Sequence, residues 1–227
     1  MNNEINWWDK LKEMWILWQH NGDCSKPHAL LTSGKHSDAF NNGSKLVESP
    51  VMLSLVVSWM IENLELLIKE EKPIWIVGPA FWAITIWHEL ARQLNTKFAF
   101  TEPVQTPEGK MQVLKRFDIK AWDTVLVVED AITTWWSITK TINVLEEIWA
   151  NVLPYVATIV NWSWSEKLWN RQISSLFYWK MNIWEKDNCE LCKCGSEAMR
   201  PKANRDKFTS KFIPISFRSH CFWSTFT

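Results

Sequence analysis

Glycine is scarce in this sequence. Its 227 residues include 6 Gly but 18 Trp, whereas average usage predicts roughly 16 Gly in a chain of this length. The excess of Trp is therefore close in size to the shortage of Gly. Trp122 precedes an apolar run and Trp149 ends a helical pattern, and glycine is typical of both positions.

We hypothesise that the gene encodes glycine with UGA and that these codons have been read as tryptophan. Trp135 and Trp136, in a Thr-Thr-Trp-Trp-Ser segment, are the positions where this matters most. The alternative is a genuinely Trp-rich protein, and UGG codons at these two positions would establish it. The candidates for authentic tryptophans are Trp7, Trp8, Trp18 and Trp179.

Net charge, membrane spans and a disulfide framework are also lacking. The formal net charge is zero, so no overall field favours nucleic acid or an anionic membrane. The N-terminal residues lack the pattern of a signal peptide, and the apolar stretches are too short or interrupted to span a bilayer. Three of the five Cys lie within 189–194, unlike a secreted disulfide framework. We expect a cytoplasmic protein that binds neither nucleic acid nor membrane.

Strand and helix patterns alternate through the middle of the chain. Such alternation predicts an α/β fold with a central parallel sheet and helices on both faces, whose ligands bind beyond the carboxyl ends of the strands. The predicted strands are 73–77, 97–101, 124–128 and 154–160, and the predicted helices are 7–19, 50–70, 82–94 and 137–149. Residues 102–117 are polar and irregular, which predicts a mobile loop.

Three regions follow from these patterns. Residues 1–48 would form an N-terminal helix and a small hood, and 49–186 the α/β core. Residues 187–227 would form a C-terminal extension, whose tail 208–227 shows no clear period.

The strand 124–128 leads into the segment that carries the chemistry. It continues as Glu129-Asp130-Ala131-Ile132-Thr133-Thr134-Trp135-Trp136-Ser137, and a helix follows. With Gly at 135 and 136, backbone N–H groups, hydroxyls and the helix dipole would form a phosphate cradle. The two acids suit ribose hydroxyls beside that phosphate, and a magnesium ion through water. An ordinary capped turn is the alternative.

Read with those glycines, VVEDAITTGGS resembles the signature of type I phosphoribosyltransferases, which bind phosphoribosyl pyrophosphate (PRPP). HALLTSGKHSD (28–38) resembles the hood segment of orotate phosphoribosyltransferases, and IVGPAFWAITIWHELA (76–91) looks like their pyrophosphate loop and following helix. FTEPVQTPEGKMQVLKRFDIKAWD looks like their mobile catalytic loop. The resemblance covers about residues 10–170 and implies the type I phosphoribosyltransferase fold.

The resemblance also implies the site. PRPP would be bound by the segment 129–137 and by Gly78, Pro79, Ala80 and Phe81. The candidate catalytic residues are Lys110, Arg116 and Asp130. A cation in the mobile loop would neutralise charge on the leaving pyrophosphate, although a solvated surface charge is the alternative for either basic residue.

The implied reaction transfers ribose 5-phosphate from PRPP to orotate, with Mg²⁺ as cofactor and a homodimer that shares its active sites. The alternatives are a phosphoribosyltransferase for a purine or uracil, and a PRPP-binding regulator without turnover. Candidate base-binding residues are Thr133, Trp162 and Lys35. Position 162 departs from the family, because an Arg that pairs with the orotate carboxylate is expected there and neither Trp nor Gly forms a bidentate pair.

Cys189, Cys192 and Cys194 form a CxxCxC pattern. A structural zinc site usually takes four ligands, and only three are clustered in the sequence. His220 and Cys221 lie far along the tail. We therefore favour free thiols over zinc and assign no protein ligand to a metal.

Overall fold

The computed structural model describes residues 6–81, 83–107, 109–133, 135–163 and 165–208. The chain divides into two compact units. The larger comprises residues 1–19 and 38–182, and the smaller comprises 20–37 and 183–227.

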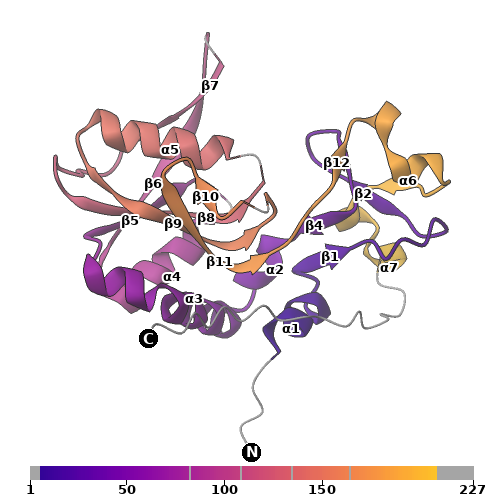
Figure 1. The fold of residues 1–227 in the computed structure, drawn as a ribbon, viewed down its shortest axis with the longest axis horizontal. Coiled ribbons are helices and arrows are strands. Elements are labelled where there is room, and N and C mark those ends of the chain that lie inside the picture. The colour runs from indigo at the N-terminus through magenta and orange to yellow at the C-terminus, as the bar shows by residue number, and fades with distance from the viewer. Residues whose placement is uncertain (1–5, 82, 108, 134, 164, 209–227) are drawn as a thin grey trace, which may run out of the picture. The chain divides into compact units, whose positions relative to one another are not determined.

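A seven-stranded sheet forms the centre of the larger unit (Figure 1), with strand order β10-β11-β9-β8-β5-β6-β7. The five central strands run parallel, and β10 and β7 are antiparallel edges. The strand bounds are β5 Trp75–Pro79, β6 Lys97–Thr106, β7 Gly109–Val113, β8 Thr124–Ile132, β9 Asn151–Asn161, β10 Lys167–Leu168 and β11 Arg171–Tyr178. The predicted α/β architecture is confirmed.

Helices cover both faces of this sheet because its central strands are apolar on both sides. Ile76 and Leu126 belong to one core cluster, beneath α3 and α4, while Val77 and Val125 belong to a second cluster with α5. Side chains alternate between the faces of a strand, so neighbouring residues enter opposite layers. Helix α5 lies on one side of the sheet and α3 and α4 on the other (Figure 1). The helices of this unit are α1 Trp7–Glu13, α2 Gly43–Val47, α3 Pro50–Glu70, α4 Ile84–Leu94 and α5 Trp136–Glu147.

Helix α3 corrects the expectation that no segment could span a bilayer. By length and composition it would be long and apolar enough to do so. Packing in the protein core also explains why this helix is apolar, because Leu53, Val57 and Leu64 are buried against the sheet. Ser49 caps its first turn by accepting a hydrogen bond from the Met52 N–H, and Pro50 is its first residue.

The smaller unit has its own four-stranded sheet, of order β12-β3-β2-β13. Its elements are β2 His28–Leu30, β3 His36–Ser37, β12 Ile183–Trp184, η1 Lys186–Asn188, α6 Glu190–Lys193, β13 Ala198–Met199, η2 Pro201–Ala203 and α7 Arg205–Phe208. The predicted boundaries at 48 and 186 do not match this division. Pairing of β12 with β3 and of β13 with β2 joins segments about 150 residues apart in the chain, which local patterns do not reveal.

Two local predictions are also wrong. The segment predicted as one helix over 7–19 forms α1 followed by β1 (Leu17–Gln19), which pairs with β4 (Ala39–Asn41). The break is at Trp15, which has φ 59°. The segment predicted as an irregular loop is largely the β6–β7 hairpin, paired from Glu102–Val113 to Thr106–Gly109.

Tryptophan occupies left-handed backbone positions unusually often. Among the described residues, six non-glycine residues have positive φ, and five of them are Trp. They are Trp15, Trp122, Trp135, Trp149 and Trp169, with φ between 53° and 69°. This conformation is costly for residues with a Cβ and is routine only for glycine. Trp87 is fully buried and its Nε1 atom lacks a hydrogen-bond partner. These observations support the glycine hypothesis.

Trp149 shows what glycine would supply. Helix α5 ends with hydrogen bonds from Ala150 N to Leu145 O and from Trp149 N to Glu146 O, the pattern of a Schellman motif whose C′ residue is usually glycine. The Trp149 side chain is 69% exposed, so it contributes little to the core.

We expect Trp149→Gly to raise the free energy of unfolding by about 1 kcal/mol, because it removes the penalty of a left-handed Cβ residue. Urea unfolding of the purified protein measures this change. Trp149→Ala keeps a Cβ and is the matched control. An equal gain in the Ala variant would attribute the effect to loss of the indole instead.

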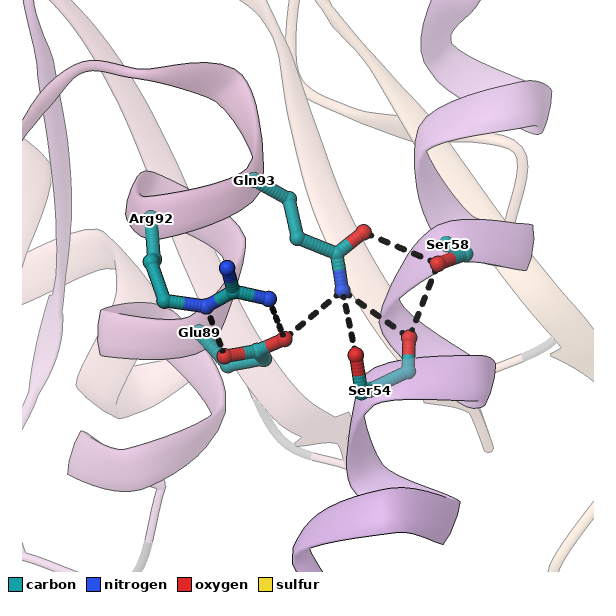
Figure 2. Close-up of polar contacts among 5 residues, drawn as sticks. All are labelled: Ser54, Ser58, Glu89, Arg92 and Gln93. Carbon is teal, nitrogen blue, oxygen red and sulfur yellow. Dashed lines mark hydrogen bonds and ion pairs between the residues drawn. The ribbon is translucent and has the colours of Figure 1, made fainter.

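A polar network fastens α3 to α4 (Figure 2). Gln93 donates from Nε2 to the Ser54 carbonyl at 2.9 Å, and its Oε1 accepts from Ser58 Oγ at 2.9 Å. Glu89 accepts from Arg92 Nε and Nη2, both at 2.7 Å, and from Gln93 Nε2 at 2.8 Å. The hydrogen bonds from Arg92 lower the pKa of Glu89 from 4.5 to about 2, against the opposing effect of burial.

This depressed pKa predicts a pH-dependent contribution to stability. A carboxylate with a lowered folded pKa stabilises above its unfolded pKa, and the contribution is lost as pH falls through the folded value. We expect Glu89→Gln to reduce the free energy of unfolding by about 1 kcal/mol at pH 7, since Arg92 is largely solvated. The difference should vanish as pH falls from about 4.5 to about 2.

Denaturant midpoints across that pH range test the contribution. Glu65→Gln, in the exposed Glu65–Lys69 pair of α3, is the matched control and should change stability little. A pH-independent loss in Glu89→Gln would contradict the assignment.

Candidate active site

A pocket of about 490 Å³ opens in the larger unit at the carboxyl ends of β5 and β8. Pro79 and Ala80 line it from the end of β5, and Glu129 and Asp130 from the end of β8. Trp136 and Ser137 contribute the start of α5, and the β6–β7 hairpin contributes a further wall. A parallel α/β sheet typically binds its ligands at this edge.

Glu129 is the most constrained group in the pocket. It is only 7% exposed, and its Oε2 accepts a hydrogen bond from Ser137 Oγ at 2.5 Å. Burial, and then the adjacent Asp130, raise the pKa of the Glu129 carboxyl well above its usual value. Two carboxyl groups held this close favour a ligand that supplies hydroxyl donors or a cation.

The turn after β5 brings backbone close to the pocket. Gly78 has no room for a side chain, because a Cβ there would come within 2.8 Å of the Val128 carbonyl oxygen and overlap the Trp87 indole. The Ala80 N–H donates to the Thr101 carbonyl at 2.7 Å. The Ala80–Phe81 peptide bond is cis. Of the four residues predicted here, Pro79 and Ala80 line the pocket, while Phe81 is exposed and does not.

The predicted phosphate loop leads directly into α5. Trp135 is the N-cap residue in a left-handed conformation with φ 57°, and its buried Nε1 has no partner. Trp136 begins the helix and places its indole at the pocket. Thr133 is exposed and Ile132 is buried in the core, beside the half-buried Ala131. Thr134 lies outside the described residues.

The hairpin holds the two predicted catalytic cations. Lys110 lies on β7, and its side chain falls outside the described part of the chain. Arg116 follows β7 and pairs with Glu102 on β6, with Nε 2.6 Å from Oε1. Neither is among the described residues that line the pocket.

Gln112 is a pocket residue that the sequence did not indicate. It lies on β7, is 3% exposed, and its Oε1 has no hydrogen-bond partner among the described residues. A buried acceptor without a partner is costly unless a ligand satisfies it. The alternation of β7 could have identified its face, had the segment been recognised as a strand.

Two further residues were predicted to bind the base, and the structure describes each within its own unit. The Trp162 side chain is packed in the apolar core with 4% exposure and does not line the pocket. An apolar indole is favoured in the core, so it offers no partner for a carboxylate. Lys35 lies in the smaller unit, with its Nζ 2.7 Å from Glu185 Oε1.

The cysteine prediction needs a correction. Cys194 forms a disulfide with Cys24 and is not a free thiol. Cys189 and Cys192 are free, but they lie against His28 and His36 of the same unit. The expectation that no protein group holds a metal therefore overlooked two histidines about 160 residues away in the chain.

The sequence is also similar to curated proteins. It is 31% identical over 194 residues to an orotate phosphoribosyltransferase of Thermoanaerobacter sp. (strain X514), covering 86% of this chain and 98% of that protein. This chain belongs to the orotate phosphoribosyltransferase family. The Thermotoga maritima orotate phosphoribosyltransferase is 30% identical over 183 residues, covering 81% of this chain and 94% of the relative. No model of a known protein family matches the sequence.

Solved structures confirm the fold. An orotate phosphoribosyltransferase from Aeropyrum pernix superposes with a TM-score of 0.57 at 19% identity, covering 75% of this chain and 92% of the other. An adenine phosphoribosyltransferase from Saccharomyces cerevisiae has the same TM-score and identity, covering 74% and 96%. The family's type I phosphoribosyltransferase fold is thus present, and the fold alone does not distinguish the base.

The raised pKa of Glu129 predicts a second pH dependence, of opposite sign to that of Glu89. A carboxyl with a raised folded pKa contributes stability below its unfolded pKa and loses it as pH rises through the folded value. We expect Glu129→Gln to be more stable than the wild type at pH 7–8 and to differ little near pH 4.

Thermal unfolding midpoints across this range measure the difference. Glu146→Gln, in an ion pair between α5 and Arg171, is the control and should show no gain at high pH. A Glu129→Gln protein that is less stable than the wild type at pH 8 would contradict a raised pKa for the buried Glu129 carboxyl.

Proposed function

We propose that this protein transfers the 5-phosphoribosyl group of PRPP to orotate, giving orotidine 5′-monophosphate and pyrophosphate, in pyrimidine biosynthesis. The observation that carries the proposal is the adjacent pair Glu129 and Asp130 at the end of β8, beside the start of α5 and in one pocket. In a member of this family, those acids suit the ribose hydroxyls of PRPP and the helix start suits its 5-phosphate.

The reaction breaks the bond between the anomeric carbon and pyrophosphate and forms one from that carbon to the base nitrogen, whose proton is released to the pyrophosphate or to water. Glu129 and Asp130 would orient the ribose as acceptors of hydroxyl hydrogen bonds. The turn at Pro79 and Ala80 would fit the pyrophosphate by its shape, since Pro79 has no N–H and the Ala80 N–H is bonded to the Thr101 carbonyl. The hairpin would close over the reacting atoms and exclude water.

Magnesium fits this donor set. Both acids offer carboxylate oxygens at the pocket, which is the ligand type that Mg²⁺ takes, often through water. A divalent cation bound with PRPP would also offset the cost of ionising buried Glu129. When bound, Mg²⁺ would supply neutralisation of charge on the pyrophosphate.

Lys110 and Arg116 are the proposed cationic groups of the hairpin. Arg116 pairs with Glu102 on the same hairpin, so Lys110 is the stronger candidate to approach leaving pyrophosphate. We propose a homodimer in which the tip of the hairpin, next to Lys110, reaches the site of the second copy, while the base of the hairpin lines the pocket of its own chain. We also propose that the enzyme is cytoplasmic.

The partner of the orotate carboxylate is a different residue from position 162. Trp162 is buried in the core, so a cation from another segment must form that pair. Lys35, predicted from the HALLTSGKHSD segment, lies in the smaller unit, where its Nζ is 2.7 Å from Glu185 Oε1.

A turnover assay with PRPP and Mg²⁺ tests the function, with orotate, uracil, adenine and hypoxanthine as alternative bases. We expect pyrophosphate release and nucleotide formation with orotate alone. Turnover with another base would move the function to a different phosphoribosyltransferase. PRPP binding without turnover on any base would indicate a regulator. Protein with Gly at 135 and 136 is assayed in parallel, because indoles there would obstruct the phosphate.

Site variants refine the result. Asp130→Asn should lower kcat/KM for PRPP roughly 10- to 100-fold, the value of a charge-assisted hydrogen bond. Lys110→Ala should lower kcat by about 10²-fold or more with little change in PRPP binding, because its charge acts on the transition state. Lys115→Ala, an exposed cation in the same segment, is the matched control. Equal losses in both lysine variants would refute a specific role for Lys110.

A further inference from the structure

Four potential metal ligands meet in the smaller unit. His28 on β2 and His36 on β3 lie beside Cys189, the N-cap residue of α6, and Cys192 within that helix. Their ligand atoms all lie within 4.8 Å of one another. The four come from three segments of the chain, and His28, His36 and Cys189 are buried.

The distances suit one tetrahedral ion. His28 Nε2 lies 3.0 Å from His36 Nδ1, 3.4 Å from Cys189 Sγ and 3.6 Å from Cys192 Sγ. Cys192 Sγ lies 3.2 Å from His36 Nδ1. Bonds of about 2.3 Å to sulfur and 2.0–2.1 Å to nitrogen place tetrahedral ligand atoms about 3.3–3.8 Å apart. Small movements would therefore centre the four atoms on a zinc ion.

A hydrogen-bond chain sets the protonation state of His28. Ser196 Oγ donates its one proton to the Lys26 carbonyl at 2.6 Å, so toward His28 Nδ1, 2.8 Å away, it can only accept. Nδ1 is then the protonated nitrogen and Nε2 carries the lone pair that faces the thiols. This arrangement of a ligating histidine and an outer hydrogen-bond partner is typical of zinc sites.

The cysteine turn is also suited to binding. The Cys192 N–H donates toward Cys189 Sγ at 3.5 Å, which stabilises a thiolate. Cys194 lies outside the cluster because it is bonded to Cys24, so the two-residue spacing of Cys189 and Cys192 is the metal-binding part of CxxCxC.

The smaller unit has a polar centre where a core is expected. Among the described residues, neither of the two apolar core clusters includes a member of this unit. Its buried side chains include the polar His28, His36, Ser37 and Ser196, and its buried apolar residues Ala29, Pro201 and Phe208 belong to neither cluster. Burial of polar groups without strong partners is costly, and small units lacking a core commonly depend on a structural metal.

We propose that His28, His36, Cys189 and Cys192 bind one structural zinc ion that holds the smaller unit together. Two imidazoles and two thiolates in tetrahedral order favour Zn²⁺ over the hard cations Mg²⁺ and Ca²⁺. Four protein ligands close the coordination shell, so the ion has no position for substrate. The site is independent of the proposed phosphoribosyl transfer and of its Mg²⁺.

Metal analysis of the purified full-length protein, prepared without added metal or affinity tag, tests the site. We expect one zinc per chain, retained on dialysis and released when the thiols are titrated with a mercurial. Replacement of zinc by Co²⁺ should give the intense visible bands of a tetrahedral thiolate site, a readout that needs no variant. Iron at equal stoichiometry, or cobalt spectra typical of octahedral coordination, would overturn the zinc assignment.

Variants separate the site from its surroundings. Cys192→Ser should lose the metal, whereas Cys192→His should retain it, and Ser196→Ala should weaken zinc affinity about 10- to 100-fold. Cys194→Ser is the matched control, since it removes a neighbouring sulfur outside the cluster; it opens the disulfide to Cys24 but should keep full zinc stoichiometry. Asp130→Asn should also keep its zinc, so failure of the proposed phosphoribosyl transfer can be distinguished from failure of the proposed zinc site. Zinc content unaffected by Cys192→Ser, or absent from reduced wild-type protein, would overturn the proposal.

Discussion

Burial of both faces of β5 and β8 is the constraint on which the active site depends. Ile76 and Leu126 enter the layer under α3 and α4, while Val77 and Val125 enter the layer under α5. Because both faces are occupied, the strands are fixed in depth and register, and their carboxyl ends meet at one edge. That edge is where Pro79 and Glu129 line the same pocket. The acids are thus positioned by apolar packing below them rather than by contacts with each other.

The smaller unit is organised on a different principle. Its segments come from both ends of the chain and are joined by short strand pairings and by the Cys24–Cys194 disulfide. With polar side chains at its centre, apolar packing cannot supply the same constraint. Soft ligands at the His–Cys cluster and hard oxygen ligands at Glu129 and Asp130 also favour different ions. One chain can therefore carry a structural and a catalytic metal site without competition between them.

Local patterns predicted what depends on local chemistry. The run 124–128 is continuous and β-branched, and it is the start of β8; the apolar period of 50–70 matches α3 residue for residue. The acidic pair and helix start at 129–137 were also readable, because strand, loop and helix follow directly in the chain. The pocket confirms that Glu129, Asp130, Trp136 and Ser137 lie together, while their roles toward PRPP remain predictions.

What the sequence did not reveal depends on pairing across distance. The hairpin of β6 and β7 was read as a loop because its residues are polar, and with it Gln112 was missed. The His–Cys cluster was not predicted because CxxCxC offers only three clustered sulfurs and no fourth ligand lies near them in the sequence, which favoured free thiols. In the structure Cys194 forms a disulfide with Cys24, and the cluster of possible metal ligands contains His28 on β2 and His36 on β3 instead. The spacing of residues in a sequence identifies candidate metal ligands, but it does not show which of them meet in the folded protein.

Backbone geometry links the unusual composition to the chemistry. Trp135 adopts φ 57° at the N-cap of α5, where a phosphate would meet the backbone N–H groups of the helix start. A left-handed residue is strained when it carries a Cβ, and Trp136 lines the pocket in which the phosphate would bind. Glycine at 135 would relieve the backbone strain, and glycine at 136 would remove an indole from the wall of the pocket. The helix start and the phosphate site would therefore both favour glycine. Trp also recurs at positive φ elsewhere in the chain, which favours UGA-encoded glycine as the common cause at these positions.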